Sequence, residues 1–111
     1  GCGILLDVNN VYVSAKNFAR DPEADLARYN LGSVTQIHIA GHSVKEDFLF
    51  DTHDETVCDA VWILLTDVLQ GLRQSSNSDR DDIPVILEND NPEVSLEQLL
   101  TEWEEGRRRC V

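Results

Sequence analysis

The sequence has 111 residues, of which 9 are basic and 21 are acidic, and its formal net charge is −12. A chain of this length forms at most one domain, and its 41% content of hydrophobic residues is too high for a disordered protein. The acidic balance repels phosphate backbones and argues against nucleic acid as a partner, and no run of 18 apolar residues is present that would indicate a membrane span.

A buried strand followed by a short helix is expected at the start of the chain. Residues 4–8 (ILLDV) form a nearly continuous apolar run, which is typical of a strand buried on both faces of a parallel sheet. Asp21 and Pro22 then provide a helix N-cap and a proline suited to the first helical position. These residues predict a short helix that ends at about Tyr29.

Two further strands and the clearest helix are expected in the middle of the chain. Residues 34–40 form the second strand, and residues 48–50 form a third, shorter one. Residues 52–55 (THDE) have the form of a capping box, which places a helix start there. The helix should end between residues 71 and 74. Its apolar residues recur at the spacing of one helix face: Val57, Val61, Leu64, Leu65, Val68, Leu69 and Leu72.

The last expected strand and helix follow a polar loop at residues 75–82. Residues 83–88 (IPVILE) form the strand, and residues 95–98 (SLEQ) form a second capping box. The helix that begins there ends in arginines 107–109, which suit the negative pole of the helix dipole. Its apolar stripe consists of Leu96, Leu99, Leu100 and Trp103.

Strands that alternate with helices indicate βαβ units, so the expected fold class is α/β, with three or four βα units in parallel order. The carboxyl ends of such strands lie on one face of the domain, where functional sites form. Each expected strand ends in residue types that bind metals, and imidazole together with carboxylate suits zinc, iron or manganese. The strand ends that carry them are residues 7–10 (DVNN), His38 with His42, residues 51–53 (DTH) and residues 88–91 (ENDN).

Each of these side chains also has a structural explanation. Asp7 could cap the turn that follows it, and His38, between two isoleucines, could be a core histidine with satisfied hydrogen bonds. Asp51 and His53 could favour the dipole of a following helix. Glu88 is harder to explain in this way, because a carboxylate on a buried strand needs a partner.

The cysteines, at positions 2, 58 and 110, are odd in number and irregularly spaced, so they predict neither a disulfide framework nor a Cys-x-x-Cys metal pair. We expect three reduced thiols in a cytoplasmic protein, with Cys58 a small buried residue of a helix. The chain opens on Gly1-Cys2-Gly3 and contains no methionine, from which we expect it to be part of a longer protein.

The residues around these strand ends resemble the DUF692 (UPF0276) family of multinuclear non-haem iron enzymes, which includes MbnB-like and TglH-like proteins. Residues 2–13 (CGILLDVNNVYV) are similar to the signature strand of the family, and residues 37–42 (IHIAGH) to its next strand. Further similar segments follow in the expected order, at residues 51–53 (DTH), 61–62 (VW) and 86–91 (ILENDN).

The resemblance implies a TIM barrel of the xylose-isomerase-like type, with residues 1–111 as its carboxy-terminal portion. It also implies two or three iron ions, and an amino-terminal half that brings further histidines and a glutamate to the cluster. The metal ligands that it implies in this chain are Asp7, Asn10, His38, Asp51, His53 and Glu88, with His42 supporting a ligand or facing the substrate.

The activity implied by the resemblance is oxygen-dependent modification of residues, often cysteine, in ribosomally synthesised peptides. The implied partners are the precursor peptide and a protein that recognises its leader. A redox-neutral metal-dependent hydrolase or isomerase of the same superfamily is the alternative, and an inactive truncated remnant is a third possibility. We expect the 111-residue chain alone to be inactive, because half a barrel leaves the cluster open to water.

Overall fold

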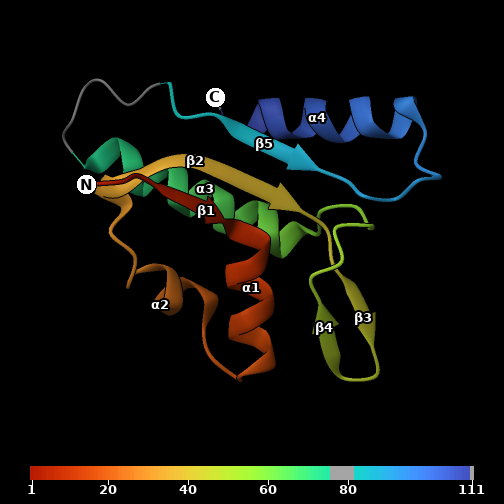
Figure 1. Ribbon diagram of the computed structural model, residues 1–111, viewed down its shortest axis with the longest axis horizontal. Helices are drawn as coiled ribbons and strands as arrows, with labels where there is room; N and C mark the ends of the chain where they lie inside the picture. The colour runs from red at the N-terminus through yellow and green to blue at the C-terminus, as the bar shows by residue number, and fades with distance from the viewer. Residues whose placement is uncertain (76–81, 111) are drawn as a thin grey trace.

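The computed structural model describes residues 1–75 and 82–110 and has a mixed α/β architecture (Figure 1). The elements in chain order are β1 (Ile4–Asp7), α1 (Val8–Asn17), α2 (Pro22–Leu26), a 3-10 turn (Leu31–Ser33), β2 (Val34–Ala40), β3 (Ser43–Lys45), β4 (Phe48–Phe50), α3 (Asp59–Gln74), β5 (Val85–Glu88) and α4 (Leu96–Cys110).

The main sheet has three parallel strands in the order β1-β2-β5, and their arrows point the same way in Figure 1. Asp7 at the end of β1 is the register partner of His38 on β2. Ala40 at the end of β2 is the partner of Glu88 on β5. The expected parallel order is therefore confirmed for three strands, and the carboxyl ends of all three lie at one edge of the sheet.

The third strand expected from the sequence, residues 48–50, was wrongly placed in the parallel sheet. It is β4, and it pairs antiparallel with β3 in a separate two-stranded sheet. A parallel crossover needs roughly a dozen residues or more, and the segment between Ala40 and Phe48 is too short for one. The side chain of Asn17 attaches this hairpin to α1: its amide donates to the Leu49 carbonyl (2.8 Å), and its carbonyl accepts from the Leu49 N–H (2.9 Å).

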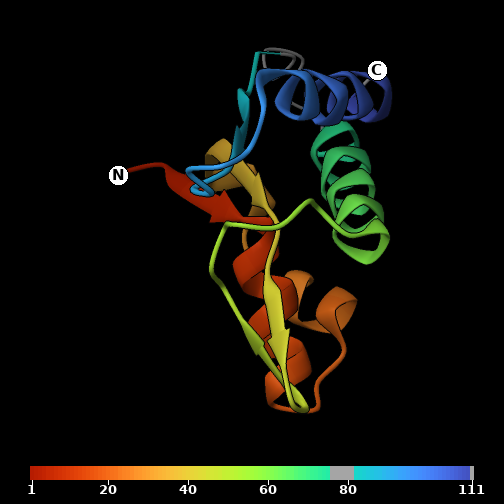
Figure 2. The same ribbon diagram turned by 90° about the vertical axis from the view of Figure 1, so that its right-hand side faces the viewer.

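Helices cover one face of the parallel sheet. Figure 2 shows α3 and α4 on the same side of the strands, and α3 also packs against α1 and α2. Leu6, Ile37 and Ile39 point to this side and are buried. Leu5 and Ile86 lie on the other face and are 51% and 38% exposed. Because side chains alternate along a strand, Asp7, His38 and Glu88 lie on this open face.

Helix α1 was missed by the sequence analysis, which expected the first helix only after Asp21. Three β-branched residues in the segment, Val8, Val11 and Val13, favour a strand by propensity. The helix forms because Asp7 caps it, with Oδ1 accepting the N–H of Asn10 at 2.8 Å. The expected cap at Asp21 is confirmed, although α2 already ends at Leu26.

The capping box expected at residues 52–55 does not form. Helix α3 begins at Asp59, and the Thr52 hydroxyl donates to the Asp54 carboxylate instead of to a helix terminus. Cys58 is the N-cap residue of α3 and only partly buried, so its assignment as a buried helix residue was wrong. All three cysteines are free. The apolar stripe of α3 is confirmed by its buried residues Val61, Leu64, Leu65, Val68 and Leu72.

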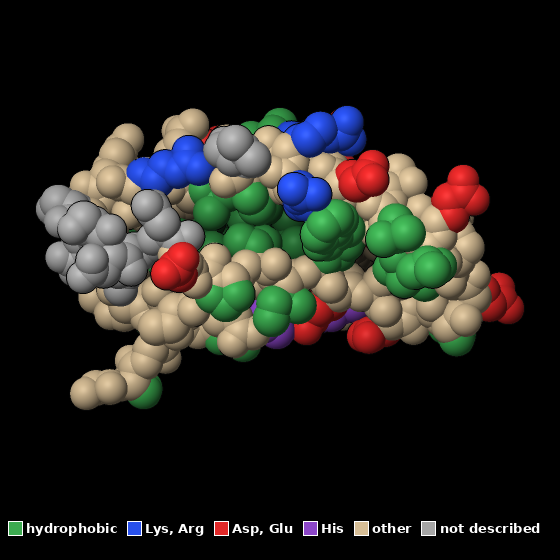
Figure 3. All heavy atoms as spheres, turned by 90° about the horizontal axis from the view of Figure 1, so that it is seen from above, with side chains coloured by type: hydrophobic (Ala, Val, Ile, Leu, Met, Phe, Trp, Pro, Cys, Tyr) green, Lys and Arg blue, Asp and Glu red, His purple; other side chains and the backbone are tan. Residues whose placement is uncertain are grey.

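Helix α4 begins with the expected capping box, in which the Gln98 N–H donates to Ser95 Oγ (3.1 Å) and the Ser95 N–H donates to Gln98 Oε1 (2.9 Å). Its apolar stripe is not buried: Leu96 is 71% exposed, and Leu100 and Trp103 are each 50% exposed. A groove of about 230 Å³ separates α4 from the sheet, and Figure 3 shows hydrophobic side chains in this hollow.

Arg108 and Arg109 at the end of α4 pair with Glu105 at 2.7 and 2.6 Å, which fits their expected structural role. The polar loop expected at residues 75–82 lies mostly outside the described residues. Within residues 1–75 and 82–110, no helix combines the length and apolar character that crossing a membrane requires.

Gly41 lies where β2 meets the loop that carries Asp51 and His53. A Cβ at this position would overlap the backbone carbonyl of Glu55, which cannot rotate away as a flexible side chain would. We therefore expect Gly41→Ala to lower the free energy of unfolding by about 1–3 kcal/mol, measured by urea denaturation. Gly1→Ala is the control, since no atom lies within 4 Å of that Cβ. Equal stability of the two variants would contradict the close approach at Gly41.

Candidate metal centre

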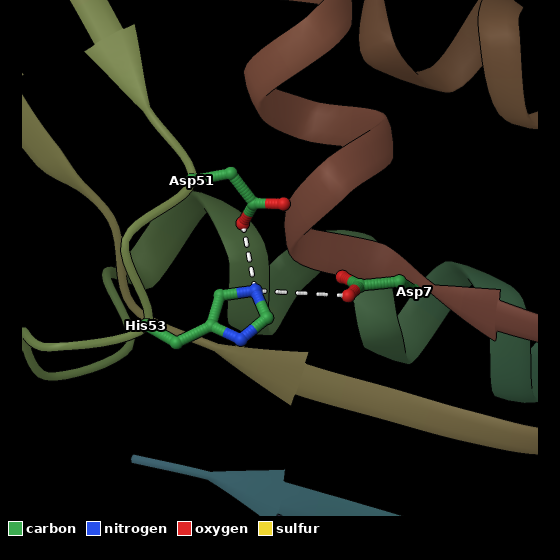
Figure 4. A group of neighbouring side chains, drawn as sticks. All are labelled: Asp7, Asp51 and His53. Carbon is green, nitrogen blue, oxygen red and sulfur yellow. Dashed lines mark hydrogen bonds and ion pairs between the residues drawn. The ribbon is translucent and has the colours of Figure 1, made fainter. Parts of the chain in front are cut away.

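Three side chains from two distant segments converge at the carboxyl end of β1. His53 Nε2 lies 2.9 Å from Asp51 Oδ1 and 3.8 Å from Asp7 Oδ2 (Figure 4). One ligand atom of each residue lies within 4.8 Å of those of the other two. Two carboxylates and one imidazole form a donor set suited to iron, manganese or zinc.

Asp7 serves both the helix and the cluster. Its Oδ1 caps α1 by accepting the Asn10 N–H, while its Oδ2 faces His53. The structural explanation of Asp7 is therefore confirmed, and the same side chain also lies in the candidate site. The junction of β1 and α1 holds this carboxylate in place, because it follows the strand directly and begins the helix.

His53 lies in a loop between β4 and α3, and its φ of 56° is in the left-handed region. This conformation is uncommon for a residue with a side chain. It costs on the order of 1–3 kcal/mol and persists where the surroundings impose it. Here the N–H of Asp90, just beyond β5, donates to the His53 carbonyl at 2.6 Å. The segment after β5 thus holds the Asp51–His53 loop against the end of the sheet.

Glu88 joins two imidazoles. Its Oε1 lies 2.8 Å from His38 Nδ1, and its Oε2 lies 3.3 Å from His53 Nδ1. Gln36 Nε2 lies 2.8 Å from His38 Nε2, and an amide nitrogen only donates, so His38 accepts there and donates from Nδ1 to Glu88. Both ring nitrogens of His38 are bonded, as its structural explanation required, and the ring also lies beside the cluster.

Asp51 is held by two amides. Asn10 Nδ2 donates to Asp51 Oδ2 at 3.1 Å, so the amide nitrogen of Asn10 faces this carboxylate. Asn9 Nδ2 donates to Asp51 Oδ1 at 2.5 Å. His42 is outside the group formed by Asp7, Asp51 and His53, and its hydrogen bond towards that group runs through Asn9, whose Oδ1 lies 2.8 Å from His42 Nδ1.

The sequence analysis assigned no role to Asn9, Gln36 or Asp90, although Asn9 and Asp90 lie in the strand-end segments 7–10 and 88–91. Gln36 is two residues before His38 on a strand, so alternation along the strand already put it on the same face. Asp90 is two residues after Glu88, where the same spacing was a weaker signal because β5 has ended. Nothing local indicated that Asn9 would be fully buried, because its partners lie 32 to 42 positions away.

The cluster carries more negative than positive charge. The pKa of Asp7 is raised, first by burial and then by the nearby carboxylates of Asp51 and Glu88; the Asn10 N–H and His53 oppose this shift. Three carboxylates thus act on one imidazole in a partly buried space. A bound cation would relieve this repulsion, and the donor set therefore fits a metal.

The sequence model of the family described as "RiPP precursor modification enzyme MbnB/TglH/ChrH" matches residues 1–110. The chain belongs to this family. The members of the family are described as enzymes that modify precursor peptides. The resemblance seen in the sequence is confirmed by this match.

Curated relatives of this MbnB/TglH/ChrH family member are named UPF0276 proteins. One from Caulobacter vibrioides (strain NA1000 / CB15N) is 38% identical over 109 residues, which is 98% of this chain and 36% of the relative. One from Anaeromyxobacter sp. (strain Fw109-5) is 55% identical over 69 residues, which is 62% of this chain and 24% of the relative. The chain thus spans about a third of the length of the Caulobacter relative.

Asp7→Asn is expected to raise the melting temperature of the metal-free protein at neutral pH. Asparagine keeps the helix cap and removes the charge that burial and the neighbouring carboxylates disfavour. Since the folded pKa of Asp7 is raised above its ordinary value of 3.8, the ionised side chain destabilises the fold as pH rises through and above that value. The increase in melting temperature should therefore shrink as the pH falls towards 3.8.

Thermal unfolding across this pH range tests the prediction. The matched control is Asp21→Asn, which changes the exposed N-cap of α2 and should leave the melting temperature nearly unchanged. A lower melting temperature for Asp7→Asn at neutral pH would show that its charge is stabilised rather than disfavoured.

Proposed function

We propose that this chain carries part of the metal centre of an iron- and oxygen-dependent enzyme that modifies residues, often cysteine, of ribosomally synthesised precursor peptides. The convergence of Asp7, Asp51 and His53 is the observation that carries the proposal. The family description supports the class of substrate. The identity of the residue that is modified is part of the proposal and follows from the resemblance alone.

We also propose that residues 1–111 form three βα units in the carboxy-terminal part of a TIM barrel. That fold has parallel strands that alternate with helices, as here, where the β3–β4 hairpin is inserted between β2 and α3, and it gathers side chains at the strand carboxyl ends. The open sheet face around Leu5 and Ile86 would then face the barrel interior, and further βα units would cover the exposed stripe of α4. The length of the curated relatives supports this view.

Asp7, Asp51 and His53 would hold an iron ion, with His53 binding through Nε2. When bound, iron supplies the redox chemistry with molecular oxygen. Glu88 would fix the His53 ring from its Nδ1 side, which is the usual support for a metal-binding imidazole. His38, Glu88 and Asn10 stay our candidates for contacts to a second or third ion, together with groups from elsewhere in the protein.

The precursor peptide and a leader-recognition protein are the proposed partners. The activity test uses a protein of the length of the relatives, loaded anaerobically with ferrous iron and mixed with a cysteine-containing precursor peptide and the partner. On addition of oxygen we expect oxygen uptake and a mass change of the peptide. Full occupancy by zinc or magnesium, with no oxygen uptake in the presence of peptide, would instead favour a hydrolase or isomerase.

Asp51→Asn should reduce turnover in this assay by about 100-fold or more, because it removes one negatively charged metal ligand and alters the pairing with His53. The matched control is Asp47→Asn at the exposed tip of the β3–β4 hairpin, which should retain normal turnover. Steady-state rates of peptide modification provide the measurement. Equal rates for the two variants would exclude Asp51 from the metal centre.

The 111-residue chain by itself is expected to show no turnover in the same assay. The sheet face beside the cluster is open, so water reaches a site whose chemistry needs an ordered and protected set of ligands. Turnover comparable to that of a full-length relative would show that the residues named here are sufficient.

A further inference from the structure

Asn9 is a fully buried polar side chain. Among the described residues, no other polar or charged side chain is buried. It lies in the first turn of α1, beside Asn10. Its amide nitrogen donates to the Gly41 carbonyl (3.2 Å) and to Asp51 Oδ1 (2.5 Å). Its carbonyl oxygen lies 2.8 Å from His42 Nδ1. One carboxamide therefore joins the end of β2, the hairpin loop and an imidazole.

The chemistry of these partners determines which atom of Asn9 faces which group. A backbone carbonyl and a carboxylate only accept hydrogen bonds, so the NH₂ group must face Gly41 and Asp51. The carbonyl oxygen of Asn9 then faces His42, and an oxygen of this kind accepts but cannot donate. His42 must therefore carry a proton on Nδ1.

The surroundings of His42 favour the neutral ring with a fixed orientation. Burial lowers the pKa of His42, and Asp51 opposes this shift more weakly. Tyr12 packs against the ring, with centroids 5.4 Å apart and planes tilted by 30°, and Lys16 lies over the Tyr12 ring. Among the described residues, no hydrogen bond reaches His42 Nε2. A neutral ring protonated on Nδ1 leaves Nε2 with its lone pair.

We propose that Asn9 is a positioning residue that couples Asp51 to His42, holding the carboxylate towards His53 and the imidazole in its Nδ1–H tautomer. Nε2 of His42 is thereby a hydrogen-bond acceptor at the edge of the cluster. The effect on Asp51 rests on the proposed metal centre, whereas the tautomer of His42 does not. Asn9 and Asn10 together occupy both oxygens of Asp51, which leaves this carboxylate little freedom to rotate.

The tautomer is measured directly by ¹⁵N NMR of the histidine side chains in the metal-free protein. The 111-residue sequence contains three histidines, so few signals need to be assigned. We expect His42 to be protonated on Nδ1, against the ordinary preference of a solvated neutral imidazole for Nε2. In Asn9→Leu, which keeps the branching at Cγ and removes the acceptor, the proton should shift to Nε2. Protonation on Nε2 in the unmodified protein would overturn the proposal.

Asn17→Leu is the matched control. Asn17 is on the same helix and also makes two hydrogen bonds through its carboxamide, but to the backbone of Leu49 instead of the cluster. It should leave the His42 tautomer unchanged. The same shift in both variants would mean that the tautomer responds to loss of structure in α1 and not to Asn9.

Metal affinity gives the second readout. Removing Asn9 should weaken binding of ferrous iron by about 10–100-fold, the usual loss when a group that orients a ligand is removed, while Asn17→Leu should bind normally. Unchanged affinity in Asn9→Leu would overturn the coupling to Asp51.

If Asn9→Leu does not fold, Asn9→Ala serves in its place, and the spectrum of the unmodified protein decides the tautomer. Absence of iron binding in the unmodified protein would instead defeat the proposed function.

Discussion

The parallel register of β2 with its two neighbours is the constraint on which the cluster depends. It places Asp7 opposite His38 and Ala40 opposite Glu88, so that three strand ends present polar side chains at one edge. A slip of one residue in either pairing would turn a whole strand over and send its polar group into the apolar side of the sheet. The buried alternation of Leu6, Ile37 and Ile39 under the helices prevents such a slip. Packing on one face of the sheet therefore determines the chemistry on the other.

Without a cation, the charged form of Asp7 at that edge is disfavoured. Asp7, Asp51 and Glu88 surround the single ring of His53. Burial raises the pKa of Asp7 most, and the carboxylates of Asp51 and Glu88 add to this shift, while the Asn10 N–H and His53 oppose it. The left-handed backbone of His53 adds strain that the surrounding hydrogen bonds must offset. Binding sites commonly lower the stability of the fold, because function requires groups that are unfavourable when no ligand is bound. The buried carboxamide of Asn9 holds the arrangement together.

The sequence predicted the parts of the fold that follow local patterns. The parallel order of β1, β2 and β5 followed from apolar runs separated by helical stripes, and the convergence of Asp7, His38 and Glu88 followed from that order. His53 was expected at the same place, but from a third parallel strand that is instead part of the β3–β4 hairpin. It could not predict α1, whose valines favour a strand until the Asp7 cap and tertiary packing decide otherwise. It placed β4 wrongly because a short apolar run does not reveal its partner. Asn9 was missed since its role depends on contacts across the fold.

The most direct test of the account is the position of a metal ion in crystals of the protein grown with manganese or ferrous iron. Anomalous scattering locates such an ion independently of any assumption about its ligands. We predict a peak within bonding distance of His53 Nε2 and of carboxylate oxygens from Asp7 and Asp51. Crystals in which these three side chains are ordered, but in which the ion lies elsewhere or no peak is present between them, would contradict the central claim.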